Sequence, residues 1–351
     1  MNPLEENQTN PRPSDDGFFM PAESHPHTRT WMSWPVEETV VADPDVAFRA
    51  WSQVANTIAR YEPLTMMADP AQLASARQWL DPAVEILAQP LDDSWMRDSG
   101  ATFLIDGRGG LAGVDWTFNG WGTGLASFDK DDQIAGRAIA HAGGRSYRST
   151  LVNEGGGIHV DGDGTVLLTE TVQLHDGRNP DWTKAAVEEE LRHFIGADKA
   201  IWFPRGLTAD YGGYGTNGHV DLLASFVRPG VVLCHVQPDP SHPDFEITRE
   251  NLEILRGTKD AHGRSLEVIE VLAPTVLEHD GKPVEYSYIN HYLANGLTLL
   301  CSFDDPRDQD AADLFARVFP DRTVELVEAP PIFRYGGGIH CITQQQPQVY
   351  P

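Results

Sequence analysis

Residues 155–159 of this chain read Gly-Gly-Gly-Ile-His, and residues 336–340 repeat the same five residues. A shorter motif, His-Val-Asp, also occurs twice, at 159–161 and at 219–221. Repeated motifs within one chain are typical of folds that are assembled from similar units. The two repeats therefore predict a protein built from related modules.

Five polar or glycine-containing stretches each lead into an apolar run that is predicted to form a strand. They are residues 97–100, 154–157, 216–219, 287–290 and 336–338. With Asp98, Glu154, His219, Asn290 and Gly338 as markers, successive stretches lie 56, 65, 71 and 48 residues apart. This spacing predicts five modules arranged around a centre, each of which presents its polar stretch to one shared cavity, as in folds with radial repeats.

Helices and strands are predicted between these stretches. Apolar residues at helical spacing indicate three helices, at 51–61, 187–194 and 311–318, and Gly196 is the expected stop of the second. Short β-like runs lie at 165–168, 222–227, 231–236 and 297–303, and several are joined by turn dipeptides such as Pro229-Gly230. We therefore expect strand pairs to alternate with helices.

The first 17 residues are polar and rich in proline, so we expect them to be unordered. No comparable linker follows, and residues 18–351 are predicted to form a single domain. The N-terminal region has no apolar segment typical of a secretion signal, and no stretch approaches the ~18 apolar residues that span a membrane. A soluble, cytoplasmic protein is expected, and assembly into a homo-oligomer is left open.

The charge of the chain limits its partners. Lysine and arginine number 26 against 52 aspartate and glutamate residues, which gives a net charge of −26. A field of this sign repels nucleic acid and anionic membranes, so neither is an expected partner. The same field favours a small cationic substrate, although many proteins are acidic only for solubility.

The three cysteines stand in different surroundings. Cys234 and Cys301 lie within apolar strand-like runs, where cysteine usually behaves as a small buried hydrophobe. Cys341 instead follows three glycines and a histidine and precedes a polar run. Three cysteines are an odd number and few for a chain of this length, which argues against a disulfide framework. Cys341 is the candidate nucleophile if the fold brings a histidine to it.

The two copies of His-Val-Asp are candidates for acid and base chemistry. In a strand, residues i and i+2 point to the same face, so His219 and Asp221 are expected to share one wall of a pocket. Histidine is the usual acid and base near neutral pH. The other copy, His159 and Asp161, precedes a predicted hairpin turn and is interpreted as mainly structural.

Two further carboxylates stand beside small residues rather than on polar helix faces. They are Asp98 and Glu154, whereas Glu188–Glu190 fit a solvated helix surface. Trp95 lies three residues before Asp98, where it could supply an aromatic wall for a cation or serve as a core side chain.

Motifs for phosphate, dinucleotide and cysteine-ligated metal sites are absent from the sequence. A divalent metal site built from histidine and aspartate stays open at this level, because such ligands suit several ions. Its candidate ligands are His159, Asp161, His219, Asp221 and His340.

Six blocks of sequence, taken together and in order, resemble the agmatine deiminase family. This family is similar to bacterial-type peptidylarginine deiminases and belongs to the guanidine-modifying superfamily. The blocks are Met20-Pro-Ala-Glu23 with Thr30-Trp-Met-Ser-Trp-Pro35, Asp93-Ser-Trp-Met-Arg-Asp-Ser-Gly100, Asp115-Trp-Thr-Phe-Asn-Gly-Trp-Gly122, Glu154-Gly-Gly-Gly-Ile-His-Val-Asp-Gly162, Thr216-Asn-Gly-His-Val-Asp221 and Gly336-Gly-Gly-Ile-His-Cys-Ile-Thr-Gln-Gln-Gln-Pro347. The resemblance covers nearly the whole chain from about residue 20 onward.

The resemblance implies a five-module α/β propeller with a central active-site cavity, in which a cysteine hydrolyses a guanidinium without a cofactor or a metal. Cys341 corresponds to the nucleophile and His219 to the acid and base. The carboxylates around the substrate correspond to Asp98, Glu154 and Asp221, and the substrate pocket to Trp95, Trp121 and Gly338. The implied reaction converts agmatine and water to N-carbamoylputrescine and ammonia. The alternatives are deimination of free arginine, a methylated guanidine or a C-terminal arginine of a peptide, and transfer of the amidino group to an amine.

One position departs from the family pattern. The family usually carries an acidic residue at or near the position before Thr-Asn-Gly-His, whereas Gly215 precedes Thr216 here and the nearest acid is Asp210. The departure concerns recognition of the substrate's tail more than the chemistry at Cys341.

Overall fold

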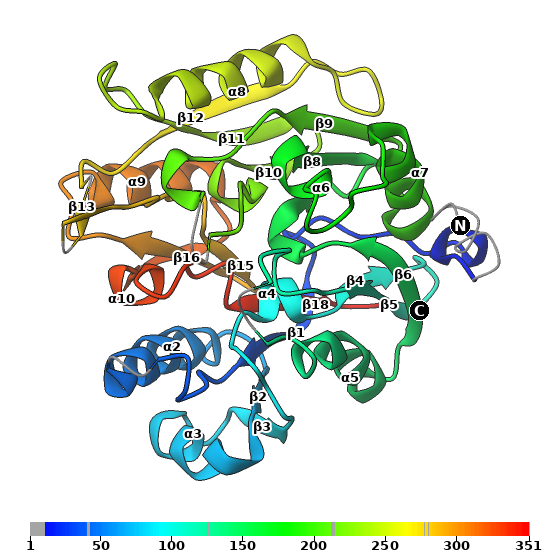
Figure 1. The fold of residues 1–351 in the computed structure, drawn as a ribbon, viewed down its shortest axis with the longest axis vertical. Coiled ribbons are helices and arrows are strands. Elements are labelled where there is room, and N and C mark those ends of the chain that lie inside the picture. The colour runs from blue at the N-terminus through cyan, green and yellow to red at the C-terminus, as the bar shows by residue number, and fades with distance from the viewer. Residues whose placement is uncertain are drawn as a thin grey trace.

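The computed structural model describes residues 11–40, 43–124, 127–211, 215–276, 278–279 and 281–350. Within these residues the strands form five small sheets of three or four strands and one short hairpin, and helices lie against the sheets (Figure 1). The structure is therefore a mixed α/β fold, as the sequence predicts.

The strands fall into groups by the sheet to which they belong. The four-stranded sheet contains β18 (Thr343–Pro347), β1 (His27–Ser33), β2 (Leu64–Ala68) and β3 (Glu85–Ala88). The three-stranded sheets contain β4 (Thr102–Ile105), β5 (Leu111–Thr117) and β6 (Arg145–Val152); β7 (Ile158–Val160), β8 (Thr165–Thr169) and β9 (Lys199–Phe203); β10 (Ala224–Arg228), β11 (Val231–Val236) and β12 (Glu267–Leu272); and β15 (Tyr292–Ala294), β16 (Leu297–Ser302) and β17 (Thr323–Glu328). The hairpin pairs β13 (Glu278–His279) with β14 (Lys282–Pro283).

The α-helices and 3-10 helices lie between these strands. The α-helices are α2 (Pro44–Ile58), α3 (Leu73–Trp79), α4 (Met96–Ser99), α5 (Ile134–Ala142), α6 (Glu170–Gln173), α7 (Lys184–Ile195), α8 (Phe245–Gly257), α9 (Asp308–Val318) and α10 (Pro330–Phe333). The 3-10 helices are η1 (Pro13–Asp16), η2 (Pro70–Gln72), η3 (Asp131–Gln133), η4 (Gly155–Gly157), η5 (Thr208–Asp210) and η6 (Val220–Leu222).

Each sheet repeats one strand pattern. Its first two strands are antiparallel, and its second and third strands are parallel and are connected through a helix, as in β7, β8 and β9 with α7 between the last two. Antiparallel neighbours need only a tight turn, whereas parallel neighbours need a crossover, usually a helix. The predicted alternation of strand pairs with helices is confirmed.

The ends of α7 show how the sequence sets an element. The Thr183 side chain accepts a hydrogen bond from the Ala186 backbone N–H at the start of the helix. Gly196 ends it in the left-handed region, at φ 73°, as expected of a glycine stop. Leu191 and Phe194 are fully buried on the inner face, so the predicted helix and its stop are confirmed.

The last strand pairs with the first, although they come from opposite ends of the chain. β18 is antiparallel to β1, with Gln344 opposite Trp31. The sequence predicts an apolar strand after residues 336–338, and this prediction was wrong, because β18 is a polar strand that is buried along its whole length. Two of its three glutamines have side-chain hydrogen bonds that offset the cost of burial: Trp31 Nε1 donates to Gln346 Oε1, and Gln344 Nε2 donates to the Ala101 carbonyl.

The predicted unordered segment at residues 1–17 is ordered in its second half. Residues 1–10 lie outside the described residues, but η1 forms at Pro13–Asp16. The Tyr147 hydroxyl donates a hydrogen bond to Asp16, and Arg145 forms an ion pair with the same carboxylate. These tertiary partners supply the order that the local composition does not.

The polar stretches that precede the first strands of the modules meet in the middle of the fold. Helix α4 packs against η4 and β18, and η4 packs against η6. Figure 1 shows α4 beside β18 in the middle of the view, with the outer helices α3, α7 and α8 at the periphery. No helix in the described parts of the chain is long and apolar enough to cross a membrane.

Candidate active site

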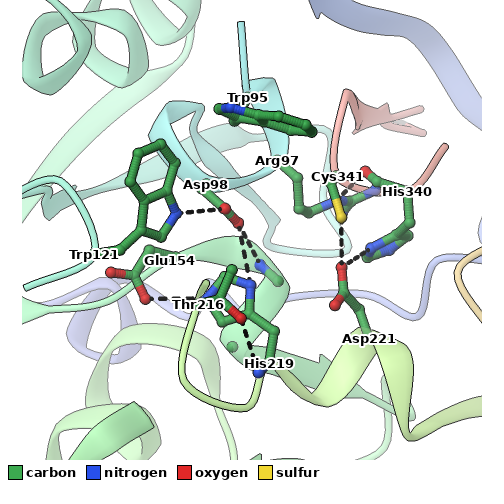
Figure 2. Close-up of polar contacts among 12 residues, drawn as sticks. Trp95, Arg97, Asp98, Trp121, Glu154, Thr216, His219, Asp221, His340 and Cys341 are labelled. Carbon is green, nitrogen blue, oxygen red and sulfur yellow. Dashed lines mark hydrogen bonds and ion pairs between the residues drawn. The ribbon is translucent and has the colours of Figure 1, made fainter. Parts of the chain in front are cut away.

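A cavity of about 670 Å³ opens above these central elements. Its lining includes Trp95, Asp98, Trp121, Thr216 and Cys341. Figure 2 shows these side chains gathered with those of Glu154, His219 and Asp221 around one site. Glu154, His219 and Asp221 are 0–2% exposed and lie deeper than the lining residues. The structure thus brings together the predicted nucleophile, histidine and carboxylates.

Cys341 is buried between an amide, a backbone N–H and a carboxylate. Its Sγ lies 3.3 Å from Asn290 Nδ2, 3.4 Å from the Gly338 backbone nitrogen and 3.6 Å from Asp221 Oδ2. Burial, with the nearby Asp221 and Asp98 carboxylates, raises the pKa of the Cys341 thiol well above its ordinary value. Cys341 is therefore a neutral thiol at pH 7 in the substrate-free protein.

His219 lies between two carboxylates. Its Nε2 is 3.3 Å from Glu154 Oε2, and its Nδ1 is 3.8 Å from Asp98 Oδ1. Burial opposes a charge on the ring, but Asp98, Glu154 and Asp221 outweigh it and raise the pKa of His219 to about 9. Because that value lies above neutrality, His219 is an imidazolium at pH 7 and can donate a proton.

Glu154 is held in place by a buried arginine. Arg178 donates from Nε to Glu154 Oε1 at 2.8 Å and from Nη2 to the Thr216 carbonyl at 2.8 Å. Burial opposes ionisation of Glu154, but Arg178 and His219 outweigh it and lower its pKa to about 2. Sequence reasoning missed Arg178, because nothing in the loop around it distinguishes it from a surface arginine.

Asp98 comes from α4 and is fixed by an unusual turn. Trp121 Nε1 donates to Asp98 Oδ2 at 2.9 Å, and Trp121 itself has a φ of 60° between Gly120 and Gly122. A positive φ is unfavourable for a bulky residue, and such strain often accompanies function. Burial, helped by Glu154 and Asp221, raises the pKa of Asp98.

Steric crowding in the site explains a glycine in the first Gly-Gly-Gly repeat. A Cβ atom on Gly156 would lie 2.5 Å from His219 Nδ1, 2.9 Å from Asp98 Oδ1 and 3.1 Å from Asp221 Oδ2. Only a glycine therefore allows these three side chains to converge, and the Gly156 backbone N–H also donates to Asp98 Oδ1.

The second repeat packs against the cysteine. A Cβ atom on Gly338 would lie 2.3 Å from Asn290 Oδ1, the side chain that also contacts Cys341. The resemblance implies that Gly338 binds substrate, but its backbone N–H points to the Cys341 sulfur and it is not among the residues that line the cavity, whereas Gly336 is. Asn290 is a module marker in the sequence, but no sequence pattern indicates its contact with the thiol.

The reason for expecting His219 and Asp221 on one wall was wrong, although the two residues do lie in the same site. They do not alternate along a strand, because His219 precedes the 3-10 helix η6, which contains Asp221. The loop before η6 is held by Asp210, which accepts hydrogen bonds from the Thr216 hydroxyl and the Gly218 N–H, both at 2.6 Å. His159, the other copy, accepts a bond from the Phe226 N–H and does not touch Cys341.

Two other cysteines and an alternative metal site also follow from the sequence. Cys234 and Cys301 are fully buried in β11 and β16, and burial raises the pKa of each thiol to about 12. In the described parts of the chain no group of three or more histidine, cysteine, aspartate or glutamate residues could hold a metal ion.

Fold and site together define a class: α/β proteins of repeated small sheets that gather a cysteine, a histidine and three carboxylates at one cavity. Residues 19–347 match the family model of the Porphyromonas-type peptidyl-arginine deiminases. The chain belongs to this family of peptidyl-arginine deiminases and agmatine deiminases.

Individual proteins agree with this assignment. The agmatine deiminase of Stutzerimonas stutzeri is 39% identical over 360 residues, covering 95% of this chain and 97% of the relative. A Streptomyces avermitilis protein named as a candidate agmatine deiminase is 57% identical over 342 residues, covering 96% of this chain and 99% of the relative. Among solved structures, the agmatine deiminase of Enterococcus faecalis has a TM-score of 0.90 at 31% identity and covers 97% of this chain and 99% of its own.

Proposed function

We propose that this protein is an agmatine deiminase, which hydrolyses agmatine to N-carbamoylputrescine and ammonia. One observation carries the proposal: a buried neutral thiol, an imidazolium and three carboxylates converge at one cavity. A guanidinium is a flat cation with several N–H donors, and carboxylates are the natural acceptors for it. Relatives that are named agmatine deiminases support agmatine as the guanidine.

In the proposed complex the guanidinium lies beside Cys341 Sγ and donates to Asp98 and Asp221. Glu154, whose two oxygens face Arg178 and His219, adds negative charge behind them. Trp95 and Trp121 form aromatic walls, and Gly338 supports the sulfur through its backbone N–H. The arriving cation stabilises the thiolate, because an opposite charge nearby favours the charged form of a group. The thiol proton passes to solvent water as the cation binds, and the thiolate is held at the face of the guanidinium carbon.

The first half of the proposed reaction breaks one C–N bond and forms one C–S bond. The Cys341 thiolate attacks the guanidinium carbon, and His219 donates its proton to the departing nitrogen, which leaves as ammonia. A covalent amidino-thioether remains on Cys341. His219 is suited to this step because its raised pKa keeps it protonated at pH 7.

The second half uses water. His219, now neutral, accepts one proton from the water that attacks the same carbon, and the C–S bond breaks to release the urea group of N-carbamoylputrescine. The second proton released returns to the thiolate. Since His219 gains back the proton that it gave, one residue acts as acid and then as base.

The acids on the wall of the cavity are proposed to recognise the ammonium tail of agmatine. Asp210 is unsuited to this role, because its carboxylate is occupied by Thr216 and Gly218. Lys130 also lines the cavity and is paired with Asp92 at 3.4 Å, but the carboxylates of Glu38, Asp92 and Asp93 in the same lining outnumber it. They would attract an ammonium and repel the carboxylate of arginine, which offsets the absence of an acid at Gly215.

The test measures ammonia release from agmatine, free arginine, a methylated guanidine, a peptide with a C-terminal arginine and butylguanidine. Agmatine is expected to have the highest kcat/KM, by about a thousandfold over arginine, because a desolvated carboxylate without a partner costs several kcal/mol. Arginine equal to agmatine would overturn the choice of substrate. Amidino transfer to an added amine, without urea product, would instead identify an amidinotransferase.

The architecture around the site is part of the proposal. The five sheets, with their shared strand pattern, are proposed to form a pseudo-symmetric five-module propeller, and residues 18–351 to work as a single catalytic domain. The pairing of β18 with β1 supports both, because it joins the two ends of the chain in one sheet. The cytoplasmic location and the absence of nucleic-acid and membrane partners stay predictions, and assembly into a homo-oligomer stays open.

A further inference from the structure

A second imidazole, outside the proposed chemistry, lies beside Asp221. His340 Nδ1 is 2.8 Å from Asp221 Oδ2, the same oxygen that lies 3.6 Å from Cys341 Sγ. Its Nε2 is 2.9 Å from Glu23 Oε1. Figure 2 shows the His340 ring and the Cys341 sulfur beside each other, both joined by dashed lines to the same Asp221 oxygen. All four residues are at most 7% exposed.

Glu23 comes from the N-terminal segment, 317 residues from His340 in the chain. Its Oε1 also lies 3.2 Å from Arg97 Nη1, and its Oε2 lies 3.6 Å from His159 Nε2. Arg97 further donates from its backbone N–H to the Cys341 carbonyl and from Nε to the His340 carbonyl. Glu23 and Arg97 therefore hold both the side chain of His340 and the backbone that carries the nucleophile.

The protonation of His340 follows from these contacts. An ionised carboxylate only accepts hydrogen bonds, so a ring with a carboxylate on each nitrogen must carry two N–H groups. Burial and Arg97 act against this charge, but Glu23 and Asp221 outweigh them and raise the pKa of His340. In turn, burial opposes ionisation of Asp221, but His340 and His219 outweigh it and lower its pKa.

His340 leaves Asp221 with one fixed oxygen and one free oxygen. Asp221 Oδ2 is bound to His340, whereas its buried Oδ1 has no hydrogen-bond partner in the structure. A buried carboxylate oxygen without a partner is costly, so a guanidinium N–H would gain by binding there. Without His340, the weak contact with the thiol would be the remaining hydrogen bond of the Asp221 side chain.

We propose that His340 and Glu23 are positioning residues, which hold the Asp221 carboxylate oriented toward the cysteine and the substrate. The proposal rests on the proposed function, in which Asp221 binds the guanidinium. It explains why histidine follows Gly-Gly-Gly-Ile in the second repeat. It also assigns a role to the N-terminal Met-Pro-Ala-Glu block, which the sequence alone leaves without one.

The test compares His340→Gln, His340→Ala and Glu23→Gln with the wild type. Glu62→Gln is the matched control, since Glu62 also forms a buried pair with a histidine, His27 at 3.1 Å, but does not contact Asp221 or Cys341. The kcat/KM for agmatine is measured from pH 5 to pH 10. Alkylation of Cys341 by iodoacetamide is followed over the same range by peptide mass spectrometry, which needs no substrate. Thermal unfolding reports the stability of each variant.

The charged and titratable groups that face His340 and Asp221 determine in which direction the pH profiles of the variants shift. They are Glu23, Arg97, His159, His219, His291, Cys341 and Asp98. Loss of the imidazolium removes a positive charge near both Asp221 and the thiol. In the His340 variants the acid limb of kcat/KM therefore moves to higher pH, because Asp221 is harder to ionise, and the alkylation profile also moves to higher pH. Glu23→Gln acts through His340: with one of its two carboxylates gone, the ring loses its proton at lower pH, and the acid limb then shifts in the same direction to a smaller extent.

Three outcomes test the proposed role of His340 and Glu23. Shifted profiles in the His340 and Glu23 variants, with an unshifted profile in Glu62→Gln, support the proposal. Unshifted pH profiles in all variants would overturn it, even if stability and kcat fall, because that pattern is what loss of packing alone produces. If the wild type fails to turn over agmatine, the proposed function fails, and the alkylation profiles still test the role of His340.

Discussion

Glu154 and His219 form a buried pair in which Nε2 of the ring lies 3.3 Å from Oε2 of the carboxylate. The other carboxylate oxygen of Glu154 is bound by Arg178 at 2.8 Å. The histidine is therefore oriented by a carboxylate that is itself fixed, and its Nδ1, which has no hydrogen-bond partner in the structure, is left available. This arrangement suits a histidine that transfers protons within the cavity.

Substitution of Cys341 by Ser or Ala is expected to abolish ammonia release while the fold is retained, because only the sulfur forms the covalent adduct. Ammonia release and circular dichroism measure the two effects. Cys234→Ala and Cys301→Ala are the controls: each leaves a small cavity and costs about 1 kcal/mol of stability or more, with little change in kcat. Wild-type activity in Cys341→Ser would contradict the mechanism.

For His219→Gln, kcat is expected to fall by about 100-fold or more, since both proton transfers lose their carrier. In the wild type, kcat should decline as the pH rises through about 9, the pKa of His219 in the substrate-free protein, because the imidazolium that protonates ammonia is lost. His159→Gln serves as the control for the repeated motif. Normal turnover by His219→Gln and loss of turnover in His159→Gln would place the chemistry at the other copy.

Gly156→Ala is expected to lower kcat/KM by about 100-fold, because the added methyl group displaces His219, Asp98 or Asp221 by a fraction of an ångström to an ångström. The matched control is Gly257→Ala in α8, where no atom lies within 4 Å of the new Cβ. Steady-state kinetics on both variants measure the difference. An active Gly156→Ala enzyme would mean that the convergence of the three side chains is not needed.

The Glu154–Arg178 pair should make stability depend on pH. The pKa of Glu154 falls from an ordinary 4.5 to about 2 on folding, so its ionisation stabilises the folded protein above pH 4.5, and this contribution is lost as the pH falls toward 2. The free energy of unfolding of Glu154→Gln is therefore expected to be lower than that of the wild type near pH 6, with the gap closing at acid pH. Urea unfolding at several pH values measures the gap, and a gap that widens toward low pH would contradict the assignment.

Asp93→Asn is expected to raise KM for agmatine several-fold and to leave KM for butylguanidine unchanged, because butylguanidine has no ammonium tail. Asp129→Asn is the control, since Asp129 is exposed and does not line the cavity. An equal effect of Asp93→Asn on both substrates would show that Asp93 shapes the cavity without recognising the tail.

The sequence alone predicted the elements that depend on local pattern. Helix α7 and its end at Gly196, and the hairpin between β7 and β8, follow from apolar spacing and turn residues, which act over a few positions. Residue types in repeated motifs also indicated Cys341, His219 and the carboxylates, because glycine beside a reactive side chain is an unusual combination. The order in the segment at Pro13–Asp16 was missed, since its partners Arg145 and Tyr147 are more than 100 residues away.

The tertiary structure decided what those residues can do. Whether Cys341 is a thiol or a thiolate depends on burial and on Asp221 and Asp98, which reach it from other modules. The links from Arg178 to Glu154, and from Glu23 through His340 to Asp221, join parts of the chain that no local pattern connects. Sequence thus determined which chemical groups are present and the short elements that carry them. Their charges and orientations were set by distances across the fold, because electrostatic interactions and desolvation depend on neighbours in space rather than along the chain.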